Sequence, residues 1–378
     1  MNYGIIPIHE GSVQATPENA GYRSESLQNL DNLLVHLIEE EKLQCSSYML
    51  SRNGKIFANK SMGKLCGFDE RGDLQPDSIR GIASITKIYT TIAILQLIEK
   101  AYIYLSQPVS SIISEFDTPI HSGITIFHLL THTSGLCPDS GYYNEPYPRG
   151  WWGNSGDGNW IKSGLSGPVL KKPGEEWIYS SFCFMVLGEI VSRISGIPYE
   201  EYVQKNIIEP MGLENTFFSV PKSLHSKVCM LSEREEKRLS PSEEPDNNRP
   251  PRSAGGIYST LEDLTKLGQL MLNKGTFNGH CILGRKTIEI MTTNQIGNIP
   301  AFHWGNQFKA YHQGLGWRIT SRNTFSSPGT FGHEGAGRSS LYIDPVEQLI
   351  AVMIVPSQIS WVPESIIGVQ GIIWSGLI

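Results

Sequence analysis

The stretch SITKIYTTIAILQLIEKAY, residues 84–102, is the part of the chain from which the fold can be worked out. Its apolar residues recur at every third or fourth position, which predicts one long helix. Ser84 and Lys87 are three residues apart, so a helix places their side chains on one face, one turn from each other. A serine at a helix N-terminus also lies beside free backbone N–H groups, which suit a nucleophile whose attack generates an oxyanion.

Two other Ser-x-x-Lys matches occur, and their context argues against both. Ser61–Lys64 contains a glycine and Ser219–Lys222 contains a proline, and neither begins a long amphipathic helix. A plainer interpretation of the first stretch stays open. In that interpretation Ser84 is only an N-cap and Lys87 is a solvated surface residue.

Two later segments could complete a site. Tyr179-Ser180-Ser181 precedes a helical pattern, where its serines could simply cap the helix. Beside the serine and lysine, however, the phenol would gain phenolate character and relay a proton. The segment GHEGAG, residues 332–337, stands between strand-like runs. It is either a glycine-rich turn or an edge where a substrate approaches the backbone and meets a second oxyanion N–H group.

Composition narrows the class of protein. The 378 residues allow roughly two domains at about 150 residues each. With 39% hydrophobic and 18% charged residues the chain is globular, and its net charge of -6 offers no footprint for a nucleic acid or an anionic membrane. We therefore expect a small molecule or a peptide as the partner.

The six cysteines are far apart and form no CxxC pair, which argues against a thiolate zinc site and a compact disulfide framework. No signal-peptide pattern opens the chain, and its apolar runs are shorter than the roughly 20 residues that cross a bilayer. We expect a cytoplasmic protein with reduced thiols. A secreted protein whose signal peptide had been removed would look the same.

The remaining elements follow from periodicity and turn residues. Helices are predicted over residues 25–42, 85–102, 124–131, 181–194, 199–208 and 261–272, and strands over 46–60 (two, around Asn53-Gly54), 314–320, 329–333, 339–344 and 349–355. The last three strands are expected to be consecutive and antiparallel. Residues 232–252 are interpreted as an exposed connection because they combine prolines with many charges.

Residues 137–175 break the pattern with Gly, Pro, Asn and aromatic residues, including Trp151 and Trp152. A long irregular loop in a compact domain is usually functional or mobile, so we interpret it as a lid or pocket wall that favours a bulky apolar or aromatic acyl group. Alternatively, its aromatic residues only pin the loop to the surface.

Other motifs fail. His128 and His132 have the spacing of a helical zinc pair, but Leu129 stands where a metalloprotease needs glutamate and no third ligand is evident. A structural role is expected for both. The chain has no G-x-S-x-G elbow and no phosphate-binding P-loop, which disfavours an α/β-hydrolase and a P-loop NTPase.

In chain order, Ser84-Ile85-Thr86-Lys87, Tyr179-Ser180-Ser181 and His333-Glu334-Gly335 resemble the serine β-lactamase and penicillin-binding protein superfamily. The run IFHLLTHTSGL, residues 126–136, is similar to the class C β-lactamase branch, which includes esterases, D-aminopeptidases and acyltransferases. Further similar segments are 210–213, 254–260 and 314–317, so the resemblance covers nearly the whole chain from about residue 25.

The resemblance implies an α/β (α+β) fold with an antiparallel sheet flanked by helices, formed by residues 1–83 and 250–378, and an all-helical domain inserted as residues 84–249. It implies that Ser84 is acylated, that Lys87 and Tyr179 activate it and protonate the leaving group, and that the N–H groups of Ser84 and Ala336 form the oxyanion hole. Either Lys87 or Tyr179 could be the acylation base. No metal or organic cofactor is implied.

Two departures from the superfamily pattern concern substrate binding. The Lys-Thr-Gly of the superfamily is replaced by His333-Glu334-Gly335. A permanently charged ammonium is thereby replaced by an imidazole that is mostly neutral near pH 7. We expect this imidazole to shape the pocket and to donate one hydrogen bond. Ser181 stands in place of an asparagine, which removes an amide donor and acceptor. Arg338 could bind a substrate carboxylate instead, or be a solvated turn residue. With Trp151 and Trp152, these residues form the expected substrate-binding set.

We therefore expect a serine hydrolase that forms an acyl-enzyme on Ser84 with small esters, amides or D-amino-acid peptides. The alternatives are a β-lactamase or DD-peptidase, a natural-product acyltransferase, and a non-catalytic protein on the same scaffold. A burst of one acyl group per chain would indicate a sensor, and no labelling at all would indicate a structural protein.

Overall fold

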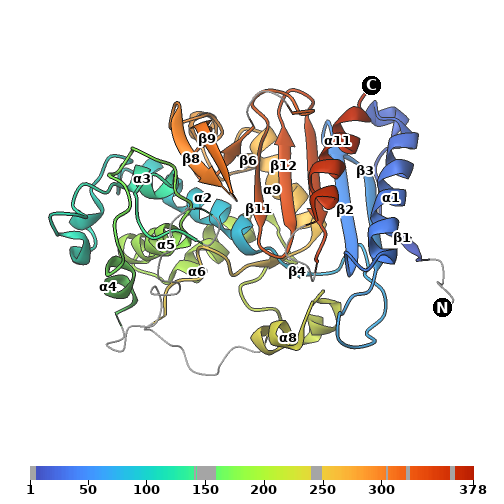
Figure 1. Cartoon of the computed structure of the whole chain (residues 1–378), viewed down its shortest axis with the longest axis horizontal. Helices are drawn as coiled ribbons and strands as arrows, with labels where there is room; N and C mark the ends of the chain where they lie inside the picture. The colour runs from blue at the N-terminus through green and yellow to red at the C-terminus, as the bar shows by residue number, and fades with distance from the viewer. Residues whose placement is uncertain are drawn as a thin grey trace.

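A seven-stranded antiparallel sheet forms the centre of the computed structural model, which describes residues 6–139, 142, 159–239, 249–303, 305–320, 324–357 and 362–378 (Figure 1). The strand order is β1-β3-β2-β13-β12-β11-β10. The strands are β1 (Ile8–Glu10), β2 (Cys45–Arg52), β3 (Lys55–Gly63), β10 (Arg318–Ile319), β11 (Phe331–Gly335), β12 (Ser339–Asp344) and β13 (Leu349–Ile354). Both ends of the chain therefore build one sheet, as the resemblance implies.

The middle of the sheet joins the two chain ends. Strand β13 is apolar throughout and fully buried, and it pairs with β2 on one side and β12 on the other. The predicted hairpin at Asn53-Gly54 joins β2 and β3, and β11, β12 and β13 are consecutive antiparallel strands. These sequence-based predictions are confirmed.

Helices cover both faces of the sheet (Figure 1). On one face lie α1 (Ser24–Glu39) and α11 (Ile367–Ser375), which contact each other, and on the other lies α9 (Leu261–Leu272). In α1 the buried leucines recur with helical spacing and pack on the apolar side chains of the sheet, which accounts for the orientation of the helix.

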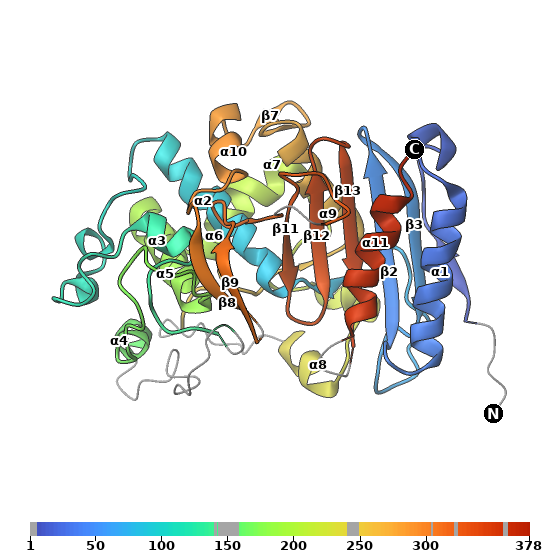
Figure 2. The same cartoon turned by 45° about the horizontal axis from the view of Figure 1, so that its top comes forward.

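A second group of helices surrounds α2 (Thr86–Glu99), whose residues are almost all buried. This group comprises α3 (Ile126–Leu130), α4 (Trp160–Leu165), α5 (Ser181–Ser195), α6 (Tyr199–Val203) and α7 (Glu209–Met211), with α10 (Arg285–Met291) nearby in Figure 2. One continuous apolar cluster runs from α2 and α5 to α9 and the sheet. The two expected domains therefore share a core, and their boundaries at residues 83 and 249 stay a prediction.

The structure also contains elements that the sequence patterns did not predict. The hairpin β8 (Ile299–His303) and β9 (Asn306–Tyr311) lies between α3 and β11 in both ribbon views (Figures 1 and 2). The expected strand over 314–320 is reduced to β10. Short pairs are formed by β4 (Arg80–Gly81) with β5 (Tyr258–Ser259) and by β6 (Thr276–Phe277) with β7 (His280–Cys281).

The first part of the connection expected at residues 232–252 is exposed at most positions, as predicted, but it forms a helix. Helix α8 (Glu233–Leu239) forms there, with Leu239 buried. Its Glu235 accepts a hydrogen bond at 2.7 Å from the buried guanidinium of Arg80. A buried charge is stable only when it is paired, so this ion pair with Arg80 anchors the helix.

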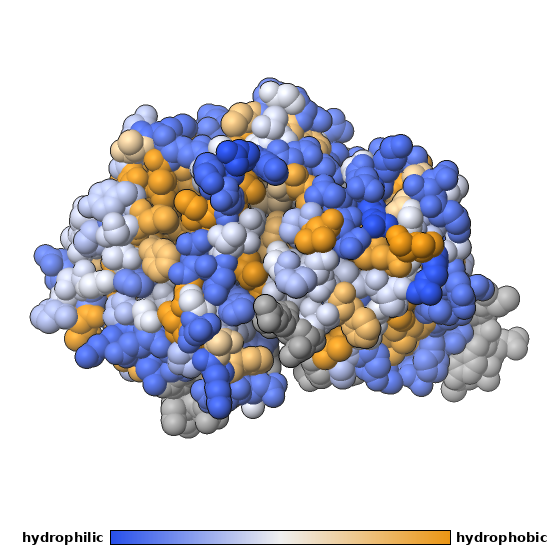
Figure 3. Space-filling view, turned by 90° about the horizontal axis from the view of Figure 1, so that it is seen from above, coloured by the Kyte–Doolittle hydropathy of each residue, from blue (hydrophilic) through white to orange (hydrophobic). Residues whose placement is uncertain are grey.

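Among the described residues, no individual helix combines the length and apolarity of a membrane span, and only α5 together with Tyr199–Met211, bent by 78°, meets those criteria as a pair. On the face drawn in Figure 3, apolar residues form several separate groups among polar ones.

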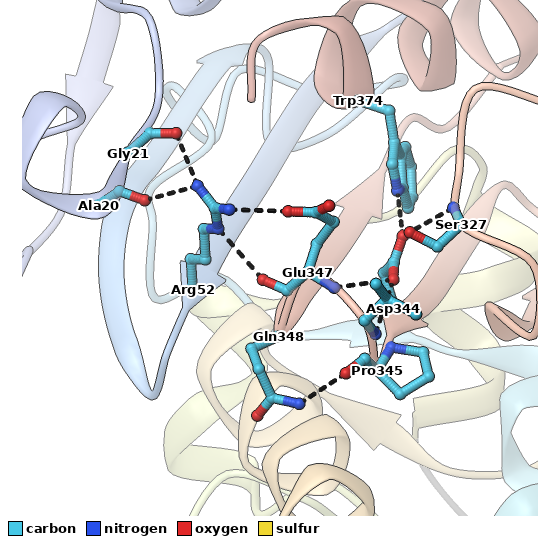
Figure 4. A network of polar contacts seen from close by, with 10 residues as sticks. Ala20, Gly21, Arg52, Ser327, Asp344, Pro345, Glu347, Gln348 and Trp374 are labelled. Carbon is cyan, nitrogen blue, oxygen red and sulfur yellow. Dashed lines mark hydrogen bonds and ion pairs between the residues drawn. The ribbon is translucent and has the colours of Figure 1, made fainter. Parts of the chain in front are cut away.

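A polar network fastens the sheet to its covering elements (Figure 4). Asp344, at the end of β12, accepts hydrogen bonds from Trp374 Nε1 at 2.8 Å and from the backbone N–H of Ser327 at 2.9 Å, as well as from two backbone N–H groups of the following turn. Nearby, Arg52 pairs with Glu347 at 2.7 Å. Burial alone would raise the pKa of Asp344, but these hydrogen bonds lower it below its usual value.

We expect Asp344→Asn to lower the free energy of unfolding by about 1–3 kcal/mol at pH 7, because an amide cannot accept all these bonds. A carboxyl with a lowered pKa stabilises the fold above its ordinary pKa of about 4, and this stabilisation is lost as the pH falls through the folded value. The difference from wild type should therefore shrink below pH 4 in urea titrations. An equal loss at pH 7 and pH 3 would contradict this account. Asp77→Asn, which removes an exposed ion pair with Lys227, is the control and should cost at most about 1 kcal/mol.

Candidate active site

Ser84 lies in a tight turn, Ala83–Ile85, that leads directly into α2. The turn contains Ala83 in the left-handed region, with φ 45°, a conformation that costs on the order of 1–3 kcal/mol and is typical of functional sites. The Thr86 side chain holds the turn by accepting hydrogen bonds at 3.1 Å from the N–H groups of Gly256 and Ile257. The N-terminus of α2 has no side-chain cap, so the plain interpretation of Ser84 as an N-cap is wrong.

Lys87 is completely buried, so its interpretation as a solvated surface residue is also wrong. Its Nζ lies 3.2 Å from Ser84 Oγ, 3.2 Å from Ser181 Oγ and 2.7 Å from the carbonyl oxygen of Ala254. Burial lowers the pKa of Lys87 to about 8, although the nearby Asp139 carboxylate opposes the shift. About a tenth of the amine is therefore neutral at pH 7, far more than for a lysine in water, and it lies next to the serine.

Tyr179 is buried beside Lys87, whose Nζ is 4.9 Å from the centroid of the phenol ring. The ring lies between those of His132 and Tyr142, at 4.3 and 4.5 Å. Burial raises the pKa of Tyr179 well above its usual value, and the hydrogen bond with the Ser84 side chain only partly offsets this. Burial therefore favours the neutral phenol over the phenolate that the sequence suggested.

The two serines after Tyr179 differ in their contacts. Ser180 caps α5, as its plain interpretation predicted, by accepting a hydrogen bond from the N–H of Cys183. Ser181 instead binds Lys87 and donates its hydroxyl proton to Asp139 Oδ2 at 2.6 Å. Sequence reasoning missed Asp139, because nothing in its local pattern sets it apart from a loop residue.

Strand β11 brings the third segment against the Ser84 turn. A Cβ at Gly335 would lie 2.3 Å from the carbonyl oxygen of Ile82, so only glycine allows this approach. Ser339 Oγ donates to the same carbonyl oxygen at 3.0 Å. Ala336 is the next residue, in the exposed turn before β12, and its role in an oxyanion hole stays a prediction.

His333 is buried on β11, and burial together with the Lys87 cation lowers its pKa to about 3, so the ring is neutral at pH 7. Its Nδ1 lies 2.9 Å from the carbonyl oxygen of Glu334. A carbonyl can only accept, so Nδ1 carries the proton and Nε2 is an acceptor. The ring is thus neutral and donates one hydrogen bond, as expected from the sequence, and the acceptor is the protein's own Glu334 carbonyl.

A cavity of about 310 Å³ opens beside these residues. Its lining includes Tyr179, His333 and Trp177, residues of hairpin β8–β9, and the exposed residues Phe325 and Ile367. The lining also includes the rings of Tyr142, His303, Phe308, Tyr311 and Tyr342. Of the expected wall at 137–175, Tyr142 lines this cavity, whereas Trp151 and Trp152 lie outside the described residues.

Two arginines lie near this region. Arg318, at the start of β10, lines the large cavity with an exposed side chain whose guanidinium carbon is 5.7 Å from the Tyr311 ring. Arg338, which the sequence offered either as a carboxylate anchor or as a turn residue, lines a separate cavity of about 30 Å³ with Ser339 and Met353. Sequence reasoning missed Arg318, although it directly follows the 314–317 segment on which the resemblance partly rests.

His128 and His132 have separate structural contacts. His128 Nδ1 accepts a hydrogen bond from the N–H of Thr125 at 3.1 Å, and His132 Nδ1 accepts one from the N–H of Ser180 at 3.2 Å. No cluster of three or more metal-ligating side chains occurs in the part of the chain that the structure describes.

The fold is that of the β-lactamases and penicillin-binding proteins. The chain belongs to the Beta-lactamase family, a family of serine hydrolases, whose family model matches residues 30–360. It is similar to a putative D-alanyl-D-alanine carboxypeptidase of Escherichia coli O157:H7, with 24% identity over 90% of this chain and 84% of the relative. The resemblance seen in the sequence is confirmed.

Two solved structures show the same fold. EstCE1, a hydrolase with promiscuous acyltransferase activity, has a TM-score of 0.76 at 19% identity, covering 93% of this chain and 99% of that one. A class C β-lactamase has a TM-score of 0.71 at 15% identity, covering 94% and 97% of the two chains.

The lowered pKa of Lys87 predicts how the reactivity of Ser84 depends on pH. A neutral amine can accept the serine proton and an ammonium cannot, so labelling of Ser84 by a fluorophosphonate should accelerate as the pH rises, with a midpoint near 8. The measurement is the labelling rate constant between pH 6 and 10, followed by intact mass. A rate that is flat over this range would contradict a role for Lys87 in deprotonating Ser84.

Proposed function

We propose that this protein is a serine hydrolase that cleaves small esters or amides, including D-amino-acid peptides, through an acyl-enzyme on Ser84. The observation that carries the proposal is the 3.2 Å approach of Ser84 Oγ to the amine of a fully buried lysine with a lowered pKa. A weak nucleophile becomes reactive when such a base lies within hydrogen-bond distance.

In the first half of the proposed reaction, neutral Lys87 accepts the hydroxyl proton as Ser84 Oγ attacks the substrate carbonyl carbon. The N–H groups of Ser84 and Ala336 stabilise the resulting oxyanion. Tyr179 then donates its phenol proton to the leaving group and regains a proton from the Lys87 ammonium, which leaves an acyl-enzyme. In the second half, water attacks this ester by the reverse sequence of proton transfers and releases the acid.

The large cavity favours substrates whose leaving group combines an apolar body with a carboxylate. Its aromatic lining suits an apolar body, and Arg318 supplies a permanent cation that can bind a carboxylate through two hydrogen bonds. A peptide that ends in a D-amino acid presents both features, and the E. coli relative bears a name of that substrate class. We propose that Arg318 binds the substrate carboxylate. His333 cannot do so, because its ring is neutral and its Nε2 atom is a hydrogen-bond acceptor.

Ser84→Ala should abolish both turnover and covalent labelling. Lys87→Ala and Tyr179→Phe should each lower kcat by about 10²-fold or more with little change in Tm, because each removes one proton-transfer group. The assay is intact mass and steady-state kinetics with acyl esters, D-amino-acid amides and penicillin. Acylation at Ser61 or Ser219, or a normal rate in the lysine or tyrosine variant, would overturn the assignment, and a burst without turnover would identify a sensor.

Arg318→Ala should lower kcat/KM for substrates with a carboxylate on the leaving group by about tenfold or more, and leave matched neutral esters nearly unchanged. Arg338→Ala is the matched control and should affect both substrates equally little. The reverse result, with selectivity lost only in the Arg338 variant, would restore the anchor expected from the sequence.

A further inference from the structure

We propose that Asp139, acting through the hydroxyl of Ser181, is a positioning residue that directs the free electron pair of neutral Lys87 toward Ser84. The inference rests on the proposed function, in which Lys87 is the base. It deepens that function by assigning a role to a carboxylate that the three sequence segments do not include.

The Asp139 carboxylate is fixed to the first turn of α5 by two hydrogen bonds. Oδ1 accepts from the backbone N–H of Ser181 at 2.8 Å, and Oδ2 accepts from its hydroxyl at 2.6 Å. The backbone N–H of Asp139 donates to the carbonyl oxygen of Tyr179 at 3.0 Å. Both the carboxylate and the backbone of Asp139 are therefore held in register with the segment that carries Tyr179 and Ser181.

The direction of these hydrogen bonds decides what Lys87 can do. A carboxylate only accepts, so the proton of the Ser181 hydroxyl is committed to Asp139, and Ser181 Oγ can only accept from Lys87. The carbonyl oxygen of Ala254 can likewise only accept. A neutral amine has two N–H bonds and one electron pair. Both N–H bonds are used by these two acceptors, so the electron pair faces the third neighbour, Ser84 Oγ.

The other titratable groups around Lys87 do not replace this carboxylate. His132 and His333 have lowered pKa values and are neutral, while burial raises the pKa of Tyr179 well above its usual value and that of Cys183 to about 11. Among these described neighbours, Asp139 is the anion, and its charge opposes the effect of burial on the Lys87 amine. Asp139 therefore influences both the direction of the electron pair and the pH at which it becomes available.

Asp139→Asn is the decisive variant. To keep its bond to the Ser181 N–H, the new amide must present its oxygen there and its NH2 group to Ser181 Oγ. The Ser181 proton then turns toward Lys87 and competes with Ser84 for the electron pair. We expect the plateau rate of fluorophosphonate labelling above pH 9 to fall about tenfold or more. The midpoint of the pH profile should move to lower pH, because an anion near the ammonium has been removed.

Ser181→Ala removes the hydroxyl and should also lower the plateau rate. Adding Asp139→Asn to Ser181→Ala should lower it no further, since the aspartate acts through that hydroxyl. A merely structural role would change Tm and leave the midpoint in place. Asp77→Asn, an exposed aspartate, is the control and should keep both the rate and the midpoint of wild type.

The outcomes separate this inference from the proposed function. If wild-type Ser84 is labelled with a midpoint near pH 8 and Asp139→Asn keeps the same plateau rate and midpoint, only the inference is overturned. If Asp139→Asn does not fold, Ser181→Ala decides, and a wild-type plateau rate in that variant overturns the inference. If wild-type Ser84 is not labelled at any pH, the proposed function fails as well.

Discussion

The burial of one lysine amine is the constraint on which the rest of the site depends. An ammonium without partners inside a protein is costly, so Lys87 requires acceptors, and they come from the Ser84 turn, from α5 and from the backbone at Ala254. These segments are up to 170 residues apart (84 to 254). The fold that brings them together also places the serine beside an amine whose pKa is lowered by burial. An arginine could not serve in its place, because its guanidinium stays charged under all ordinary conditions.

The sheet provides the part of the site that faces the Ser84 turn, and both ends of the chain contribute strands to this sheet. Residues 8–63 provide three strands and residues 318–354 provide four, and the pairing of β13 with β2 locks the two groups together. This arrangement fixes β11 next to the turn that carries Ser84, at a separation that only glycine at position 335 permits. Buried hydrogen bonds such as those to Asp344 keep the covering helix α11 in place.

Much of the fold could be predicted from the sequence because strong periodicity reflects burial. Residues 261–272 and 339–344 form a helix and a strand with the expected bounds, and the segments containing Ser84, Tyr179 and His333 meet as the resemblance implied. The hairpin β8–β9 was missed because its exposed and half-buried residues do not alternate regularly. Asp139 and Arg318 were missed for another reason: their importance comes from partners far away in the chain, which no local pattern records.

The inward hydrogen bond of His333 has a consequence for the charge of the cavity at different pH values. A histidine exposed to water changes charge between pH 5 and 8, and a site built on it would change its preference over that range. Here the Nδ1–H group donates a hydrogen bond to the Glu334 carbonyl, and burial keeps the ring uncharged down to a pH of about 3. His333 therefore adds no charge to the cavity in acidic or neutral surroundings, so of His333 and Lys87 only the lysine changes its charge near neutral pH.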